Sequence, residues 1–349
     1  MKALLVKTSS LGDLIHTMPA ITDAFMAIPG LELDWAVEDR FIEVCNWHSL
    51  VHKTLPVSFH ACRKHLKSFH FLNIFRELKA ARARIAAKEY DLVIDAQGLY
   101  KSALITYWAH GHKVGFSRSS LSEKLASSFY QTRIDGTRDM DIIERNRRLF
   151  ADAFKYQIPS SAPDFSIATS RFKYMSETRP YILFIHSASW PTKSYPSEFW
   201  QSLAKLAEAS GYQVRIPWYS PSERERAAHI AQNISGSCLV QVDLGIMGGL
   251  IHKAAGTVCV ETGFAHLAAA LGRPTVTLYG ATGTLRHGTH GPIQTNCTAQ
   301  IACSPCYSRK CIHVDALREN IPCMLEHEAE DIWGKLEKLL HRESKIQPN

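Results

Sequence analysis

The sequence predicts an α/β protein made of two doubly wound domains, on the basis of its length, an alternation of elements and one interruption. The 349 residues are 46% hydrophobic and 21% charged, which is typical of globular proteins and enough for two domains with separate cores. Short buried apolar runs alternate with helical stretches, as in parallel sheets with crossover helices. Residues 160–176 are serine-rich and break the alternation, so we interpret them as a linker.

The first half begins with an apolar run at 3–6, which predicts a buried parallel strand. A loop follows, and a helix is expected from Asp13 because apolar residues then recur at helical spacing. Further strands are expected at 32–37 and 91–96. These elements define a first domain, residues 1–165.

The second half repeats the alternation from residue 181. Strands are expected at 181–186, 212–217, 237–241, 257–260 and 274–279. Helices are expected at 196–209, 221–234, 245–254, 263–271 and, with an amphipathic pattern, 327–342. We therefore predict a second domain at 178–325 and a C-terminal helix and tail at 326–349, with the two domains facing a central cleft.

The positive charge is concentrated in one stretch. The chain carries +7 overall, whereas the part between His52 and Lys88 holds nine bases and a single acid, Glu77, a net +8 that leaves −1 for the rest. A modest basic excess fits a phosphate-bearing partner. The stretch lacks an aromatic RNA- or DNA-binding motif, so no nucleic-acid partner is expected.

No targeting segment is recognised at the N-terminus, where Lys7 and Asp13 interrupt the apolar run. No stretch reaches the ~18 apolar residues of a transmembrane helix. We expect a cytoplasmic protein, with peripheral membrane contact left open. The nine cysteines are an odd number and cannot all pair as disulfides.

The loop at 7–13, K-T-S-S-L-G-D, follows the first strand and starts a helix. Such a turn offers free backbone N–H groups at the carboxyl edge of a sheet, where open α/β folds bind ligands. Gly12 permits close approach, and the single glycine excludes a dinucleotide fingerprint. Asp13 then has two interpretations: it caps the helix together with Ser10, or it is catalytic.

Three motifs of the second half also follow predicted strands: 186–196, 216–225 and 260–267. Their lysine and helix starts could neutralise a phosphate, and their acids could bind sugar hydroxyls or simply cap helices. For His266 a packed structural histidine is the alternative, and for Lys193 an ordinary exposed lysine. The layout is that of a nucleotide-sugar transferase, with the donor in the second domain and the acceptor in the first.

These segments resemble the heptosyltransferases of lipopolysaccharide inner-core synthesis, which have the GT-B fold. The similarity is carried by VKTSSLGDLIHTMPAITDA at 6–24, LDWAVE at 33–38, VIDAQGLYKSA at 93–103, LASSFY at 125–130 and VETGFAHLAAALGRPTVTLYG at 260–280. It spans about residues 1–280 in order and spacing, and it is greatest to the members that add the first heptose. A membrane-surface enzyme of a Gram-negative bacterium is implied, on the cytoplasmic face of the inner membrane.

The resemblance implies ADP-heptose as donor, the inner Kdo of Kdo2-lipid A as acceptor, inversion at the anomeric carbon, and no cofactor. Asp13 matches the general base of the family, and Glu223 the residue that holds the donor ribose. The implied donor-binding residues are Ser187, Ser189, Lys193, Glu223, Glu261, Thr262, Gly263 and His266. The implied acceptor-binding residues are Ser10, Gly12, Arg63, Lys64 and Gln97.

Two departures from the family pattern concern the donor motifs: Glu261 stands where aspartate is common, and Ala188 where a threonine is common. A third feature is C-x2-C-x4-C-x11-C, formed by Cys303, Cys306, Cys311 and Cys323. Four thiolates at such spacing could bind zinc, although reduced structural cysteines are the preferred interpretation and no metal is expected. Similar clusters occur in the second-heptose members of the family.

Alternatives therefore remain open. Within the family, the acceptor could be an already heptosylated core, as for heptosyltransferases II and III. In another class, the same two-domain scaffold could belong to a nucleotide-sugar epimerase or a non-catalytic nucleotide binder.

Overall fold

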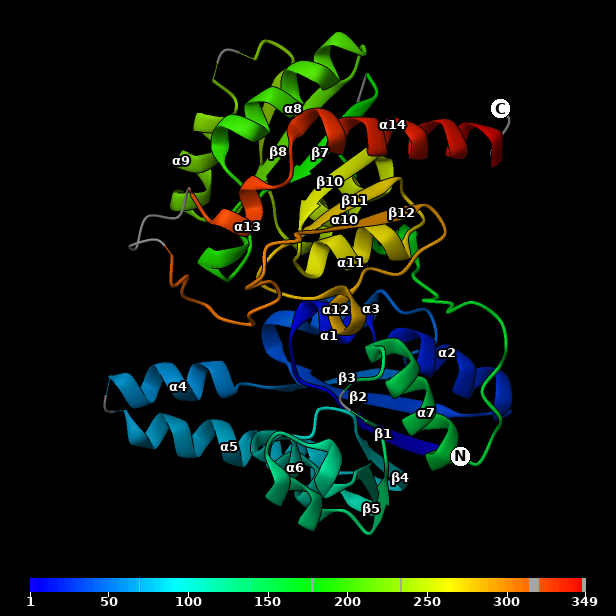
Figure 1. The fold of residues 1–349 in the computed structure, drawn as a ribbon. Helices are drawn as coiled ribbons and strands as arrows, with labels where there is room; N and C mark the ends of the chain where they lie inside the picture. Colours follow the sequence, from blue (N-terminus) through cyan, green and yellow to red (C-terminus); the bar gives the residue numbers. More distant parts are fainter. Residues whose placement is uncertain (69, 138, 177–178, 233, 314–319, 347–349) are drawn as a thin grey trace. The chain divides into compact units, whose positions relative to one another are not determined.

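The computed structural model describes residues 1–349 except 69, 138, 177–178, 233, 314–319 and 347–349. The chain divides into two units, Met1–Ala168 and Thr169–Asn349 (Figure 1). Each unit holds one six-stranded sheet.

The first unit alternates strands with helices. Its strands are β1 (Lys2–Val6), β2 (Glu32–Glu38), β3 (Lys53–Val57), β4 (Glu89–Asp95), β5 (His110–Phe116) and β6 (Thr132–Ile134). Its α-helices are α1 (Leu11–Ile15), α2 (Met18–Ala27), α3 (Ile42–Asn46), α4 (Phe59–Lys67), α5 (Phe71–Ala86), α6 (Tyr100–Trp108) and α7 (Ile142–Phe154).

The second unit follows the same scheme. Its strands are β7 (Tyr181–Ile185), β8 (Gln213–Trp218), β9 (Ser237–Gln241), β10 (Gly256–Val260), β11 (Thr275–Tyr279) and β12 (Gln294–Thr298). Its α-helices are α8 (Ser197–Ala209), α9 (Pro221–Ile230), α10 (Leu244–Lys253), α11 (Gly263–Ala270), α12 (Thr284–His287), α13 (Pro322–Leu325) and α14 (Ala329–Ile346).

Both sheets are doubly wound, as the sequence predicts. The strand order is β3-β2-β1-β4-β5-β6 in the first and β12-β11-β10-β7-β8-β9 in the second, and the strands pair in parallel. The chain therefore changes direction between β1 and β4, and again between β7 and β10. A crevice opens at such a switch point beside the carboxyl ends of the two strands.

The helix expected from Asp13 is in fact two helices, so this prediction is wrong in detail. α1 ends at Ile15, and α2 begins at Met18 with Thr17 as its N-cap and Pro19 in its first turn. Proline has no N–H to donate and is tolerated only in the first turn of a helix. The helical spacing of the apolar residues continues through this break, which hides it in the sequence.

Each sheet has its own core. In the first unit, Leu4 and Val93 of the strands pack with Ile85 of α5 and Ile105 of α6. In the second, Val258 and Leu336 belong to one buried cluster that joins β10 to α14. The C-terminal amphipathic helix thus buries its apolar face in the second unit.

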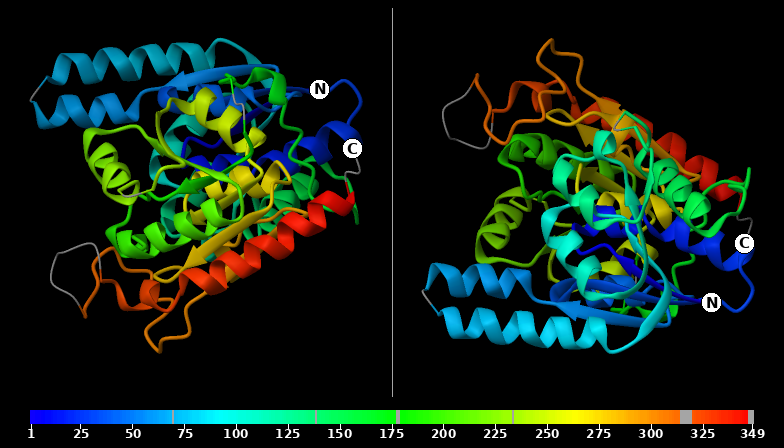
Figure 2. Two further views of the ribbon diagram at one scale, coloured as in Figure 1. Left: turned by 90° about the horizontal axis from the view of Figure 1, so that it is seen from above. Right: turned by 90° about the horizontal axis from the view of Figure 1, so that it is seen from below.

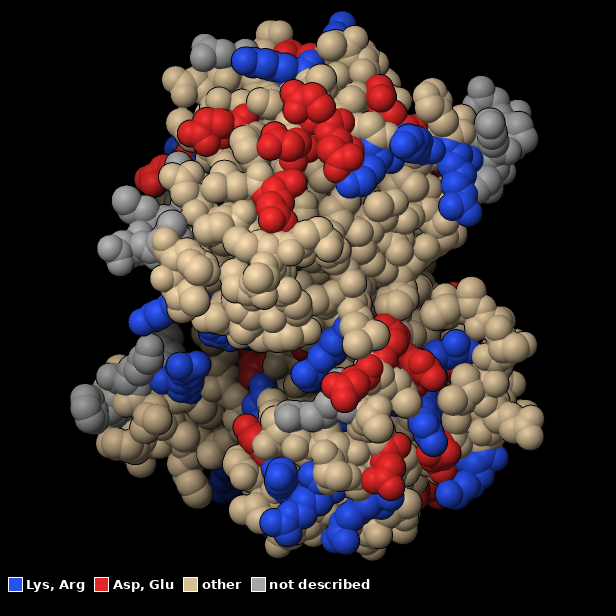
Figure 3. All heavy atoms as spheres, viewed as in Figure 1, with Lys and Arg blue, Asp and Glu red and all other residues tan. Residues whose placement is uncertain are grey.

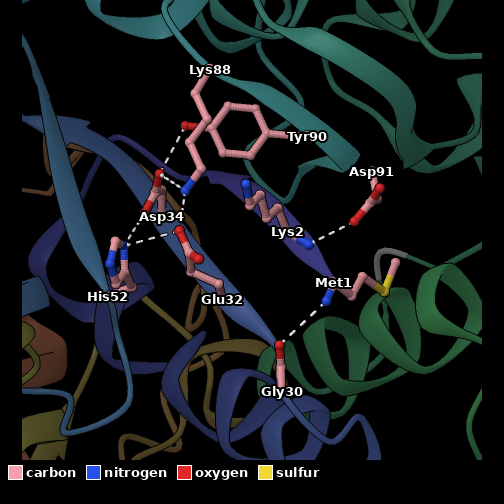
Figure 4. A network of polar contacts seen from close by, with 9 residues as sticks. All are labelled: Met1, Lys2, Gly30, Glu32, Asp34, His52, Lys88, Tyr90 and Asp91. Atoms are coloured by element: carbon pink, nitrogen blue, oxygen red, sulfur yellow. Dashed lines mark hydrogen bonds and ion pairs between the residues drawn. The ribbon is translucent and has the colours of Figure 1, made fainter.

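A polar network closes the amino-terminal edge of the first sheet, opposite the switch-point crevice (Figure 4). Asp34 accepts hydrogen bonds from Tyr90 Oη at 2.9 Å and Lys88 Nζ at 3.0 Å, and it contacts His52 Nδ1 at 2.9 Å. Burial raises the pKa of Asp34, but these hydrogen bonds outweigh it and the net shift is downward. Lys88 also pairs with Glu32, so one lysine is shared by the two carboxylates.

Candidate active site

The loop after β1 is fastened to the end of β4 across the first switch point. Gln97 Oε1 accepts hydrogen bonds from the backbone N–H groups of Thr8 at 3.0 Å and Ser9 at 3.2 Å. Lys7 Nζ donates to the carbonyl of Ala96 at 2.9 Å. These hydrogen bonds join two segments that are about 90 residues apart in sequence, the loop with Asp13 and the end of β4. Together the two segments form the carboxyl edge of the sheet at the switch point.

Asp13 occupies the first turn of α1. Its Oδ2 accepts hydrogen bonds from the Ser10 backbone N–H and from Ser10 Oγ, each at 2.8 Å. Asp13 is half-buried, Ser10 is exposed and Gly12 is buried. The capping interpretation is therefore correct, and the same hydrogen bonds fix the Asp13 carboxylate at the carboxyl edge of the sheet.

The buried carboxylate of Asp95 fixes the backbone turn that carries Gln97. Asp95 Oδ1 accepts from the backbone N–H groups of Gln97 and Gly98 at 2.9 Å each, and Tyr130 Oη donates to Oδ2 at 2.7 Å. Gly98 has φ of +70°, a conformation that favours glycine. Burial raises the pKa of Asp95, although its hydrogen bonds act in the opposite direction.

Two residues that we did not predict join this edge. Lys101 Nζ donates to Ser9 Oγ at 3.0 Å, and the Glu38 backbone N–H donates to the Thr8 carbonyl at 3.2 Å. Burial lowers the pKa of Lys101, against the favourable charges of Glu38 and Asp13, and burial raises the pKa of Glu38. Both follow predicted strands closely, so their position at a strand end was the available signal.

The predicted acceptor residues of the basic stretch lie on α4. This helix begins beside Glu38, whose Oε2 accepts from the backbone N–H of His60 at 3.3 Å. Arg63 follows within the next turn and is exposed. The side chain of Lys64 lies outside the described residues.

The second unit has a cavity of about 270 Å³ at the carboxyl ends of β7 and β8. Four predicted donor residues line it: Ser187, Ser189, Glu223 and Thr262. Its other walls include Trp218, Tyr219, Met247 and Phe264. An apolar and aromatic cavity with a few polar groups, close in size to the smaller sites for organic ligands, suits a nucleoside. Met247 and Phe264 were not predicted as site residues, although Phe264 lies within the motif at 260–267 and Met247 at the start of a predicted helix.

The first turns of α9 and α11 and the buried His186 contribute to the wall of this cavity. Glu223 Oε2 accepts from the backbone N–H groups of Tyr219 at 2.8 Å and Ser220 at 3.0 Å, so Glu223 caps α9 while it lines the cavity. Thr262 is the N-cap of α11, and Gly263 is its first residue. His186 links the ends of β7 and β8 through Pro217 O at 3.0 Å. Burial lowers the pKa of His186 to about 4.

The remaining predicted donor residues form a separate buried cluster. Lys193 pairs with Glu261 Oε2, which also accepts from Thr282 Oγ1 at 2.8 Å, while His266 Nε2 lies 3.9 Å from Oε1. Burial raises the pKa of Glu261, but the close contact with His266 and the charge of Lys193 prevail and lower it to about 2. Lys193 Nζ also lies 4.7 Å from the centre of the Trp190 ring, so this lysine is not an ordinary exposed one.

The four cysteines of the candidate zinc motif line one small cavity of about 60 Å³, next to Gly280 and Thr192. Burial raises the pKa of Cys323 to about 11, and the other three thiols act in the same direction. Among the described residues, one set of three or more His, Cys, Asp or Glu side chains has all its ligand atoms within 4.8 Å of one another, and this set is Glu32, Asp34 and His52. Lys88 is ion-paired with both carboxylates of that group (Figure 4). The interpretation of the four cysteines as reduced structural residues stays a prediction.

The model of glycosyltransferase family 9 (heptosyltransferase) matches residues 78–316. The chain belongs to this family. Lipopolysaccharide heptosyltransferase 1 of Pseudomonas aeruginosa is 37% identical over 97% of this chain and 98% of the relative. The protein of that name from Salmonella typhimurium is 40% identical over 87% of this chain and 95% of the relative. The resemblance to the first-heptose members is thereby confirmed.

A solved structure of a relative agrees. The Escherichia coli heptosyltransferase WaaC with ADP has a TM-score of 0.84 and 34% identity, and the match covers 97% of this chain and 100% of that one. The prediction of a GT-B fold, and of an enzyme that is a glycosyltransferase, is confirmed. In the part of the chain that the structure describes, no helix combines the length and the hydropathy needed to cross a bilayer.

Proposed function

We propose that this family 9 enzyme transfers L-glycero-D-manno-heptose from ADP-heptose to the inner Kdo of Kdo2-lipid A, with inversion and with Asp13 as the general base. The observation that carries the proposal is the cavity of about 270 Å³ at the second switch point, in a chain whose structural relative was solved with ADP. The family membership supplies the sugar-transfer chemistry, and the cavity supplies a place for the nucleotide.

The donor assignment is supported by the chemistry of the cavity walls. Trp218 and Tyr219 offer aromatic surface for a purine, and Glu223 offers a carboxylate that can accept from ribose hydroxyls. α11 begins at the cavity with Thr262 and Gly263. The N-terminus of a helix favours the negative charge of a diphosphate.

In the proposed reaction the acceptor hydroxyl lies beside Asp13. The carboxylate takes the hydroxyl proton while the hydroxyl oxygen attacks the anomeric carbon of the heptose from the face opposite ADP. The new C–O bond forms as the bond to the ADP oxygen breaks, so the configuration inverts and ADP leaves with the bonding electron pair. Ser10 and Gln97 hold the loop that presents Asp13.

Charge compensation differs between the two substrates. For the leaving ADP, the start of α11 and the nearby Lys193 are the proposed positive partners; Lys193 shares its charge with Glu261. For the anionic acceptor, Arg63 and Lys64 of α4 and the newly found Lys101 are the proposed partners. Arginine suits phosphate and carboxylate groups because its planar guanidinium donates two parallel hydrogen bonds.

The decisive experiment is mass spectrometry of the product formed from Kdo2-lipid A and ADP-heptose. We expect the acceptor to gain one heptose, with ADP released in equal amount. An enzyme that ignores Kdo2-lipid A but extends a heptosylated core would instead be of the second- or third-heptose type. Binding of ADP-heptose without transfer to either acceptor would contradict the proposal and favour a nucleotide-sugar binder.

A further inference from the structure

The α4–α5 helical hairpin is anchored at one end only. α5 packs on the first sheet through Ala81 and Ile85, which are buried in its core. The part of α5 near Phe71 carries no such buried residue, and it runs beside α4 beyond the edge strand β3 (Figures 1 and 2). The hairpin thus presents an end that the core of its own domain does not cover.

This end carries large apolar side chains that are exposed. Leu66 is 56% exposed, Phe71 60%, Leu72 83% and Phe75 68%. Phe71, Leu72 and Phe75 occupy positions i, i+1 and i+4 of α5 and therefore lie on one side of the helix. Scattered single apolar residues need no explanation, but a cluster of this kind on a protruding element indicates an interaction surface.

Basic residues follow these apolar residues on the same side of α5, toward its C-terminus. Leu72, Arg76 and Lys79 are spaced i, i+4, i+7, and so are Phe75, Lys79 and Arg82. Arg76, Lys79 and Arg82 are all exposed, and Glu77 is the one acid between His52 and Lys88. In Figure 3 this region shows Lys and Arg among uncharged surface. An exposed apolar helix end followed, on the same side, by about two turns of cations combines buriable apolar surface with attraction to anionic lipids, the two contributions that hold a protein at a membrane interface.

We propose that this hairpin docks the enzyme on an anionic lipid bilayer, with Leu72 and Phe75 entering the interface and Arg76, Lys79 and Arg82 contacting lipid phosphates. The charge favours lipid phosphate over a neutral partner, since clustered bases are attracted to an anionic leaflet and the attraction fades with ionic strength. The hairpin projects beyond the edge strand β3 (Figures 1 and 2), which suits contact with a planar bilayer. This docking goes beyond the proposed transfer reaction, because it requires neither donor nor acceptor.

The test uses the full chain with vesicles that contain no Kdo2-lipid A. We expect sedimentation with phosphatidylcholine vesicles containing phosphatidylglycerol, weaker binding at high salt and little binding to pure phosphatidylcholine. The double substitution Leu72→Ser and Phe75→Ser should weaken binding at least about tenfold. Met26→Ser is the control, because Met26 lies on α2 and is 80% exposed, as Leu72 is 83% on α5.

A charge series tests the second half of the surface. Substituting Arg76, Lys79 and Arg82 with glutamine should weaken binding to anionic vesicles at least about tenfold. The matched control replaces Arg118, Arg148 and Lys155, three exposed bases of the same domain, and should bind like the wild type. Equal effects of the two triple variants would overturn the proposal, because overall charge would then suffice.

Two further results would also overturn it. One is unchanged vesicle binding by both hairpin variants. The other is a wild-type dimer that the Leu72→Ser, Phe75→Ser variant loses while vesicle binding persists, since the surface would then contact a second copy of the chain. Failure of heptosyl transfer with vesicle binding intact would count against the proposed function alone.

Discussion

The two switch points share a topology but differ in chemistry. In the first unit the crevice edge is polar: Gln97 fastens the loop that carries Asp13, and Lys101 and Glu38 stand beside it. In the second unit the corresponding edge surrounds a cavity with aromatic walls that is also lined by Glu223, and the Lys193–Glu261 ion pair lies apart from it. The edge of the first unit offers a carboxylate that can accept a proton. The edge of the second unit offers a cavity that can bury a planar aromatic group.

The difference teaches that the doubly wound fold supplies a position and the loops supply the reaction. A general base must keep a carboxylate within reach of a hydroxyl, and the half-buried, helix-capping Asp13 is the residue proposed for that role. A nucleoside is held mainly by removal of apolar surface from water, and the cavity at β7 and β8 is the site proposed for it. If the assignment is correct, substitutions at the first edge change kcat and those at the second change donor affinity.

The largest effect is expected for Asp13→Ala. Removing a general base should lower kcat about 10²- to 10⁴-fold, with little change in the KM for ADP-heptose. Initial rates of ADP release measure both. Asp141→Ala is the matched control, because Asp141 caps α7 of the same domain through the N–H groups of Ile143 and Glu144. Similar loss of kcat in both variants would show that Asp13 is only a cap.

The Lys193–Glu261 pair should also contribute to stability, apart from the role proposed for Lys193 toward ADP. Lys193→Met leaves a buried carboxylate without its cation, which should cost about 3–5 kcal/mol in the free energy of unfolding. Adding Glu261→Gln should restore most of this, since the uncompensated charge is then gone. Denaturant unfolding of the two variants and the wild type measures it; a double variant as unstable as Lys193→Met would contradict the prediction.

The same pair predicts a pH dependence. Folding lowers the pKa of Glu261 from 4.5 to about 2, so its ionised form stabilises the fold above pH 4.5 and that contribution is lost as the pH falls toward 2. The wild type should therefore keep its advantage over Glu261→Gln above about pH 5 and lose part of it between pH 5 and pH 3. Asp243→Asn serves as control, because its pair with Lys173 is exposed and is expected to contribute no more than about 1 kcal/mol.

Glu223→Ala should act on the second edge alone. Losing a carboxylate that accepts from ribose hydroxyls should raise the donor KM about 10- to 100-fold, as expected for a hydrogen bond to a charged group, while kcat stays near the wild-type value. Glu198→Ala removes the corresponding first-turn acid of α8, which is exposed, and should change neither. A fall in kcat without a change in the KM for ADP-heptose would contradict the assignment of donor binding to the second edge.

The smallest effect is expected at Gln97, which positions the loop. Gln97→Ala removes the acceptor for two backbone N–H groups and should lower kcat about tenfold, because each lost hydrogen bond contributes about 1 kcal/mol. Gln97→Glu keeps an acceptor oxygen and should recover most of the rate. A loss confined to thermal stability, with kcat unchanged, would assign Gln97 a structural role only.

Sequence patterns predicted more of the fold than of the site. Apolar runs and their spacing located most strands and helices of the second unit, because burial and period are local properties. The break between α1 and α2 was missed, since the apolar spacing continues across Thr17 and Pro19. Lys101 and Glu38 were missed because their importance arises from their contacts with residues 7–13.

By itself the sequence determined the fold class, the family and a charged stretch between His52 and Lys88. Only the tertiary structure decided what the singled-out residues contact: Lys193 pairs with Glu261, Glu223 caps a helix beside a cavity, and the exposed side chains of α5 share one face. Periodicity and motifs reflect interactions within a few residues of chain. Ion pairs and cavities join strands whose order in the sheet differs from their order in sequence, so they emerge only when the chain folds.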